Sequence, residues 1–134
     1  MILVLKDPSI NVFTRDVERL AKFYIRYGFR ETFRTPKEGN PTHVEVTLDH
    51  FTIGVSSVDA AVHDHGLSPN LGGRPVSILL WSDDVDADYA RFIHDGAPSL
   101  RPPHDFGPTL RTAWVADPDG NPINLAQRRT PGGR

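Results

Sequence analysis

The chain has 134 residues, of which 38% are hydrophobic and 24% are charged, a composition that is ordinary for one soluble globular domain. Its formal net charge of -2 gives no indication of a nucleic-acid partner or of binding to an anionic membrane. The chain has no cysteine, which excludes disulfides and thiolate metal sites, and its apolar runs are too short for a signal peptide or a membrane span, so we expect a cytoplasmic protein.

The first half of the chain has the pattern of a strand, a capped helix and three further strands. A short apolar strand from Ser9 is followed by Asp16, which can cap a helix, and by Gly28, which can end it. Between them, apolar residues recur at helical spacing. Three strand candidates follow at about 29–34, 42–48 and 51–56. These elements predict a βαβββ module over about residues 8–57.

Residues 58–73 contain three glycines and one proline and read as a linker, which could begin with one helical turn after Ser57. The second half then repeats the first. Ser77 aligns with Ser9, Asp84 with Asp16 and Gly96 with Gly28. Strand candidates follow at about 98–101, 110–116 and 122–127.

The repeat predicts a second βαβββ module over about residues 74–128, with 129–134 as a frayed tail. Residues 101–110 contain three prolines, and we expect them to form a stiff loop that could close over a ligand. The expected fold class is α+β, with the tandem modules in one domain. Together they would form a curved, cup-shaped mixed sheet with helices on its outer face.

Strand periodicity predicts which side chains line the cup, because alternate residues of a strand take opposite faces. Trp114 faces the cup if Asp117 pairs with Asn121 across a three-residue loop, whereas a two-residue loop would turn it toward the helix. An aromatic concavity with a few polar groups is typical of a small-molecule site. The candidate ligand-binding residues are Asn11, Phe13, His43, Glu45, Ser77, Leu79, Trp81, Phe106, Trp114 and Asn124.

The twin modules, the segment DVERLAKFYIRYGF and the segment VADPDGNPINLAQ together resemble the vicinal oxygen chelate superfamily. This superfamily includes glyoxalases, extradiol dioxygenases and the fosfomycin- and bleomycin-resistance proteins. The resemblance implies a cup-shaped site. In the enzymes of the superfamily, this cup holds a divalent metal through His, Gln or Glu on the first and last strands of each module. The matching positions in this chain are Ser9, Gly54, Ser77 and Asn124.

None of these four side chains is a good ligand for a divalent ion. We therefore expect no metal and no cofactor, and the resemblance points to the metal-free, antibiotic-binding branch. That branch implies sequestration of an aromatic or conjugated antibiotic of the bleomycin, mitomycin or enediyne kind. It also implies a homodimer, in which Pro8 could act as a hinge for exchange of the N-terminal strand.

Three alternatives remain open. A displaced metal could use His43 and Glu45 with a third ligand such as His50 or His104. A metal-free lyase, isomerase or dioxygenase-like enzyme could use His43 or Glu45 as a general base. The aromatic residues could instead fill a core or a dimer interface, which would leave a structural domain without a ligand.

Overall fold

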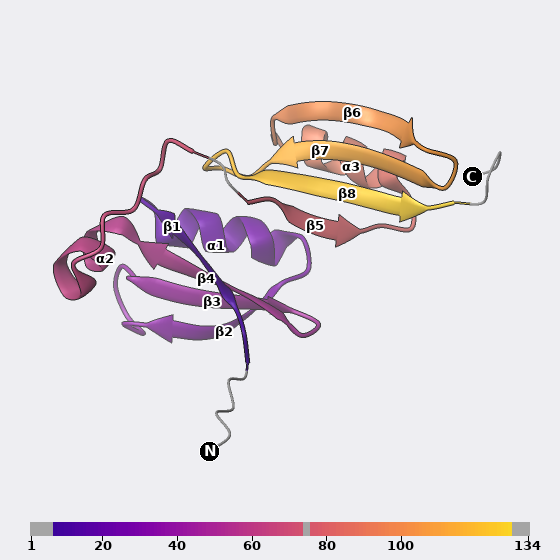
Figure 1. Ribbon diagram of the computed structural model, residues 1–134. Coiled ribbons are helices and arrows are strands. Elements are labelled where there is room, and N and C mark those ends of the chain that lie inside the picture. Colours follow the sequence, from indigo (N-terminus) through magenta and orange to yellow (C-terminus); the bar gives the residue numbers. More distant parts are fainter. Residues whose placement is uncertain (1–6, 74–75, 130–134) are drawn as a thin grey trace, which may run out of the picture. The chain divides into compact units, whose positions relative to one another are not determined.

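The computed structural model describes residues 7–73 and 76–129 (Figure 1). The chain divides into two compact units, Met1–Gly72 and Gly73–Arg134. Each unit has its own mixed four-stranded sheet, so the strands form two sheets and not one continuous sheet. The predicted α+β class and the tandem βαβββ order are confirmed.

Unit 1 contains one mixed sheet with the order β1-β4-β3-β2, in which β1 runs parallel to β4 and the other pairs are antiparallel. Asp16 caps the first helix as predicted, since its carboxylate accepts from the backbone N–H of Arg19 at 3.1 Å. The elements are β1 (Ile10–Thr14), α1 (Val17–Arg26), β2 (Arg30–Thr35), β3 (His43–Leu48), β4 (Phe51–Ser57) and α2 (Val58–His65).

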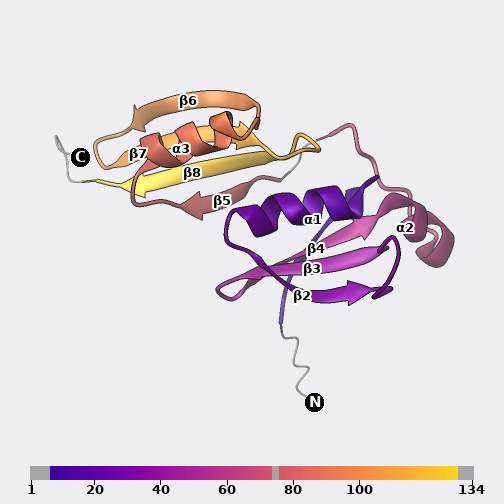
Figure 2. The same ribbon diagram turned by 180° about the vertical axis from the view of Figure 1, so that it is seen from behind.

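Helix α1 covers one face of the unit 1 sheet and leaves the other face uncovered by any helix (Figure 2). Its buried residues Leu20 and Tyr24 pack toward the buried strand residues Val44, Val46 and Ile53. The ring of Tyr24 meets Phe29 edge to face with centroids 5.4 Å apart. The apolar stripe predicted from the sequence is therefore the core of this unit.

An ion pair ties α1 to the edge of the same sheet. Arg34 of β2 donates to the two carboxylate oxygens of Glu18 at 2.8 and 2.7 Å, and it also donates to Glu31. The Arg34 guanidinium lowers the pKa of both carboxyls below their ordinary value of 4.5. Arg34, on the helix-covered face of the sheet, is thus paired with two carboxylates.

Unit 2 repeats the arrangement with the sheet order β5-β8-β7-β6, and α3 covers one face of it. Asp84 caps α3 by accepting from the backbone N–H of Ala87 at 3.1 Å. Arg111 of β7 pairs with Asp86 in the first turn of α3, as Arg34 pairs with Glu18 in unit 1. The elements are β5 (Ile78–Trp81), α3 (Val85–His94), β6 (Ser99–Phe106), β7 (Leu110–Ala116) and β8 (Pro122–Arg128).

The prediction of a loop over residues 101–110 is wrong for residues 101–106, because β6 continues to Phe106, and only 107–109 form a turn. Strand β6 lies at the edge of the sheet and pairs only with β7, so a proline can stand where no ladder donor is needed. The pairing shifts register on both sides of Arg101, and Pro102 and Pro103 lie within the second of these irregularities. The prolines therefore interrupt the ladder without ending the strand.

The linker prediction is also wrong in part, because its first half is helix α2. Ser57 caps this helix by accepting from the backbone N–H of Ala60 at 3.2 Å, and Gly66 ends it in the left-handed conformation with φ of 64°. The helix is weakly amphipathic and buries only Ala61, which explains why periodicity did not reveal its full length. It packs against β4 and belongs to unit 1.

The expectation of a frayed C-terminal tail is wrong at its first residue. The backbone N–H of Arg129 donates to Thr109 at 2.8 Å, and its guanidinium pairs with Asp105. The rest of the predicted tail, 130–134, lies outside the described residues, as do 74–75 at the start of the second module. Within 7–73 and 76–129, no helix is long and apolar enough to cross a membrane.

Candidate functional site

Each sheet has one face that its helix leaves uncovered, which we call the open face of that unit. Because alternate strand residues take opposite faces, the cross-strand register decides which side chains gather there. In unit 2 the register pairs Leu79 with Asn124 and Asn124 with Trp114. The next row pairs Trp81 with Ala126 and Ala126 with Thr112.

The turn between β7 and β8 determines that Trp114 lies on the open face. Asp117 and Asn121 pair through the backbone at 3.0 Å, which leaves three residues in the loop. Gly120 takes a φ of 87° there, a conformation that favours glycine. The three-residue loop is thus the one found, and Trp114 lies beside Asn124 and not on the helix side.

The open face of unit 2 is rich in accessible apolar surface. Trp81 is 52% exposed, Leu79 47% and Phe106 66%. Asn124 lies in the same face, where its amide oxygen accepts a hydrogen bond from the Thr112 hydroxyl at 2.6 Å. A row of exposed apolar side chains beside a placed amide can stack a flat ligand and orient it by hydrogen bonds.

Two arginines that the sequence analysis did not select also belong to this face. Arg128 lies two residues beyond Ala126 on β8, and its guanidinium carbon is 3.8 Å from the centroid of the Trp81 ring. Arg101 is the cross-strand partner of Trp114. Strand parity alone would have revealed Arg128, whereas Arg101 was missed because its segment was predicted to be a loop.

The open face of unit 1 is built around Gly54, which lies between Asn11 on β1 and Glu45 on β3. A Cβ atom on Gly54 would overlap the side-chain oxygen of Asn11 and would lie 2.9 Å from Cε1 of His43. The missing side chain therefore provides the space in which Asn11 and His43 approach each other. This is a packing role for a glycine inside a strand.

His43 is held from both sides on the same face. Its Nε2 lies 3.0 Å from the Glu45 carboxylate, and its Nδ1 lies 2.8 Å from the Ser56 hydroxyl. A carboxylate only accepts, so Nε2 carries a proton and Nδ1 of the neutral ring accepts from Ser56. Phe33 is 49% exposed, and the centroid of its ring lies 6.1 Å from the centroid of the His43 imidazole.

We expect Gly54→Ala to disturb this arrangement, since the added methyl group must displace Asn11 and push against His43. The free energy of unfolding should fall by about 1–3 kcal/mol, the usual cost of overpacking. The nitrogen NMR shifts of the His43 imidazole should also change, since its hydrogen bonds to Glu45 and Ser56 are strained. Chemical denaturation and NMR together measure both effects.

The matched control is the double variant Asn11→Ala with Gly54→Ala. Removing the Asn11 amide relieves the larger overlap, so the double variant should recover part of the lost stability. Unchanged stability and unchanged imidazole shifts in Gly54→Ala would show that the space above Gly54 is unimportant.

The residues at the four positions where the family resemblance implies metal ligands do not fit a divalent ion. Ser9 and Ser77 are exposed and lie before their strands begin, and Gly54 has no side chain. Asn124 offers an uncharged amide whose oxygen already accepts from Thr112. Such a set supplies neither the imidazoles nor the carboxylates that hold a catalytic divalent ion.

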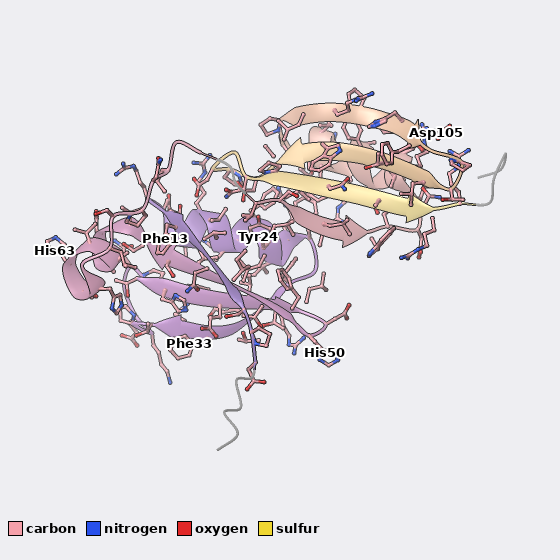
Figure 3. All side chains as sticks on the ribbon, in the orientation of Figure 1. Phe13, Tyr24, Phe33, His50, His63 and Asp105 are labelled. Atoms are coloured by element: carbon pink, nitrogen blue, oxygen red, sulfur yellow. The ribbon has the colours of Figure 1, made fainter. Side chains whose placement is uncertain are left out.

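At the alternative metal site, His43 and Glu45 lie close together, but the third ligand proposed in unit 1 is too far away. His50 lies in the turn at the far end of the β3–β4 hairpin, a whole strand away from His43 (Figure 3). His104 belongs to unit 2, where its Nδ1 lies 2.9 Å from the Pro102 carbonyl. Among residues 7–73 and 76–129, no three His, Asp or Glu side chains cluster as a metal site would require.

The helix-side surface of unit 2 carries a polar hollow of about 490 Å³. Asp86 and Asp105 in its lining pair with Arg111, and Asp105 also pairs with Arg129. The pKa of Arg111 is raised by its hydrogen bonds to these carboxylates. The two arginines of this hollow are thus held by carboxylates in an ion network.

The predicted site residues fall into two groups, one on each unit. Most of them lie on an open face, as strand parity predicted, and Ser77 lies just before β5. Phe106 is placed on the open face by the edge strand and not by a closing loop. Unit 1 carries Asn11, Phe13, His43 and Glu45, and unit 2 carries Leu79, Trp81, Phe106, Trp114 and Asn124.

Comparison with known proteins agrees with this architecture. Residues 8–125 match the family described as the Glyoxalase/Bleomycin resistance protein/Dioxygenase superfamily. The uncharacterized protein Mb0911c of Mycobacterium bovis is 28% identical over 127 residues, which cover 90% of this chain and 84% of that protein.

Two solved structures show the same fold. One is a family enzyme from Burkholderia phytofirmans PsJN, with a TM-score of 0.77 and 22% identity, covering 90% of this chain and 98% of that one. The other is TnmS3, an antibiotic binding protein from Streptomyces sp. CB03234, with a TM-score of 0.69 and 24% identity, covering 96% of this chain and 100% of that one.

Proposed function

Because the chain belongs to the glyoxalase/bleomycin resistance protein/dioxygenase superfamily, we propose that it is a non-catalytic protein that sequesters an aromatic or conjugated antibiotic. The ligand would lie on the open face of unit 2, against Trp81 and Trp114, with Asn124 as a hydrogen-bonding group. On unit 1, Asn11, His43 and Glu45 would be polar contacts for a ligand on that unit's own open face.

One observation carries this proposal: both tryptophans of the chain lie on one open sheet face, near Asn124, whose uncharged amide is a poor ligand for a divalent ion. Burying exposed indole surface favours a flat hydrophobic ligand, and each stacked aromatic pair adds about 0.5–1.5 kcal/mol beyond the area buried. The poor fit of Ser9, Gly54, Ser77 and Asn124 to a divalent ion favours binding over metal-dependent chemistry. TnmS3, an antibiotic binding protein of the same fold, gives a precedent for the proposed activity.

A titration of chelator-treated protein with bleomycin, mitomycin C and an enediyne tests the proposal. Since both tryptophans lie in unit 2, intrinsic fluorescence reports on the proposed site. We expect saturable quenching by at least one of these drugs at a stoichiometric ratio, and mass spectrometry should recover the drug unchanged. Binding that requires an added divalent metal, or conversion of the drug, would reject sequestration as the function.

A second candidate function is supported by the hydrogen-bonded chain of Glu45, His43 and Ser56. A base oriented by a carboxylate and contacting a hydroxyl is the arrangement of general-base catalysis, so a metal-free lyase or isomerase could use His43. Turnover of a small metabolite by chelator-treated protein that is lost in His43→Gln would favour this enzyme. Unaltered recovery of every tested compound would favour sequestration.

We also propose a homodimer, as the family resemblance implies. In the structure β1 pairs with β4 of its own chain, so exchange of the N-terminal strand around Pro8 would require this pairing to form between two chains. Sedimentation equilibrium at micromolar concentration measures the association, and a monomer mass across the concentration range would reject the dimer.

A further inference from the structure

The open face of unit 2 carries two arginines, Arg101 and Arg128, that form no ion pair among residues 76–129. Arg128 lies over the Trp81 ring, with its guanidinium carbon 3.8 Å from the centroid. Arg101 lies opposite Trp114 in the register of β6 and β7. Each arginine thus stands next to one of the two indoles.

These two arginines differ from the arginines on the helix side of the sheets. Arg111 pairs with Asp86 and Asp105, and Arg34 pairs with Glu18 and Glu31. Within the part of the chain that the structure describes, neither Arg101 nor Arg128 makes an ion pair with a carboxylate.

The sequence of the strands explains this difference. The only acidic residue in β5, β6, β7 and β8 is Asp105, and its pairs with Arg111 and Arg129 place it on the helix side. The open face therefore has two guanidinium groups and no strand carboxylate, although the whole chain has a formal net charge of -2. Charge is segregated between the two faces of one sheet.

Stacking on an indole prepares a guanidinium to bind an anion. The stacked arrangement uses the flat face of the guanidinium and leaves its N–H donors in the plane, where they can form two parallel bonds to a carboxylate or phosphate. The Trp81 ring also holds Arg128 in place before a ligand arrives, which reduces the entropy lost on binding. An aromatic ring next to such an anion would stack on exposed indole surface.

We propose that the ligand of the open face of unit 2 is an aromatic anion, whose acidic group pairs with Arg128 while its ring system stacks against the tryptophans. Arg101 adds to the attraction through its charge. This inference rests on the proposed function, because it specifies the ligand class of the same site. A neutral or cationic drug would leave the Arg128 donors unused.

The test compares anthraquinone-2-carboxylate with anthraquinone-2-carboxamide, which share one ring system and differ in charge. Calorimetry and tryptophan quenching should show the carboxylate binding about tenfold more tightly than the carboxamide, as a charge-assisted pair predicts. Raising the salt concentration from about 0.05 to about 0.5 M should weaken binding of the carboxylate and leave the affinity for the carboxamide nearly unchanged.

Variants locate the anion. Arg128→Gln should remove the preference for the carboxylate, and Arg128→Lys, which keeps the charge but not the planar fork, should restore part of it. Arg101→Gln should reduce the preference for the carboxylate by less than Arg128→Gln does. Arg91→Gln is the matched control, because it removes one positive charge from α3 on the opposite face of the same sheet, and it should bind like the parent protein.

The outcomes separate this inference from the proposed function. If the carboxamide binds as tightly as the carboxylate, the anion inference is overturned while aromatic binding stands. If Arg128→Gln and Arg91→Gln both keep the preference, the anion lies elsewhere and the assignment to Arg128 is wrong. If neither compound binds and the drug panel also fails, both the ligand class and the sequestration function are rejected.

Discussion

The variant Trp81→Ala is expected to weaken binding of a planar aromatic ligand by about 1–3 kcal/mol and to leave unit 2 folded. The indole is 52% exposed, so removing it deletes stacking surface and little of the core. It also removes the ring on which Arg128 stacks, so an anionic ligand should lose more affinity than a neutral one. Calorimetry measures the affinity, and far-UV circular dichroism measures the fold.

Two further variants control this experiment. Trp81→Phe keeps an aromatic ring and should retain most of the affinity, whereas Ile78→Ala truncates a buried residue of the same strand and should lower stability without a specific loss of binding. If Trp81→Ala unfolds unit 2, the indole is part of a core or an interface, and the stacking role is rejected.

The variant Asp117→Ala is expected to lower the free energy of unfolding of unit 2 by about 2–3 kcal/mol, because it leaves half-buried donors without an acceptor. Asp117 is 1% exposed, and its carboxylate accepts from the backbone N–H groups of Asp119 and Asn121, both at 2.9 Å. It also accepts from the Asn121 side chain at 2.8 Å. These bonds stabilise the three-residue loop that sets the pairing of Trp114 with Asn124.

Tryptophan fluorescence during chemical denaturation measures this loss, since both indoles belong to unit 2. Asp117→Asn keeps one acceptor oxygen and should lose less stability, and Asp83→Ala removes an exposed carboxylate of the same unit and should change little. An unchanged unfolding midpoint in Asp117→Ala would mean that the turn forms without these hydrogen bonds.

Much of the fold was predictable because its signals are local. A capping aspartate, an apolar stripe at helical spacing and a terminating glycine specify each long helix through contacts within a few residues. Strand parity correctly separated the buried Ile123 and Leu125 from Asn124, since the period of two depends only on the backbone. The repeat of these signals in the second half predicted the tandem βαβββ units.

The sequence was misleading where the secondary structure of a segment depends on a neighbouring strand or on contacts that stabilise a short helix. Pro102 and Pro103 suggested a loop, but an edge strand with a single partner accommodates both. The length of helix α2 was underestimated, because its stability comes from two caps and one buried alanine and not from a periodic apolar stripe.

From the order of its residues alone, this protein could be read as two βαβββ units with aromatic open faces and with side chains unsuited to a divalent metal. The units and their faces follow from periodicity and capping, whereas the four positions compared with metal ligands are those that the family resemblance implies. Three features required the folded chain: the space above Gly54 that Asn11 and His43 share, the hydrogen bonds that hold His43, and the stacking of Arg128 on Trp81. The Gly54 space, the bond of His43 to Ser56 and the stacking of Arg128 join different strands, and their geometry depends on register and packing, which no local pattern encodes.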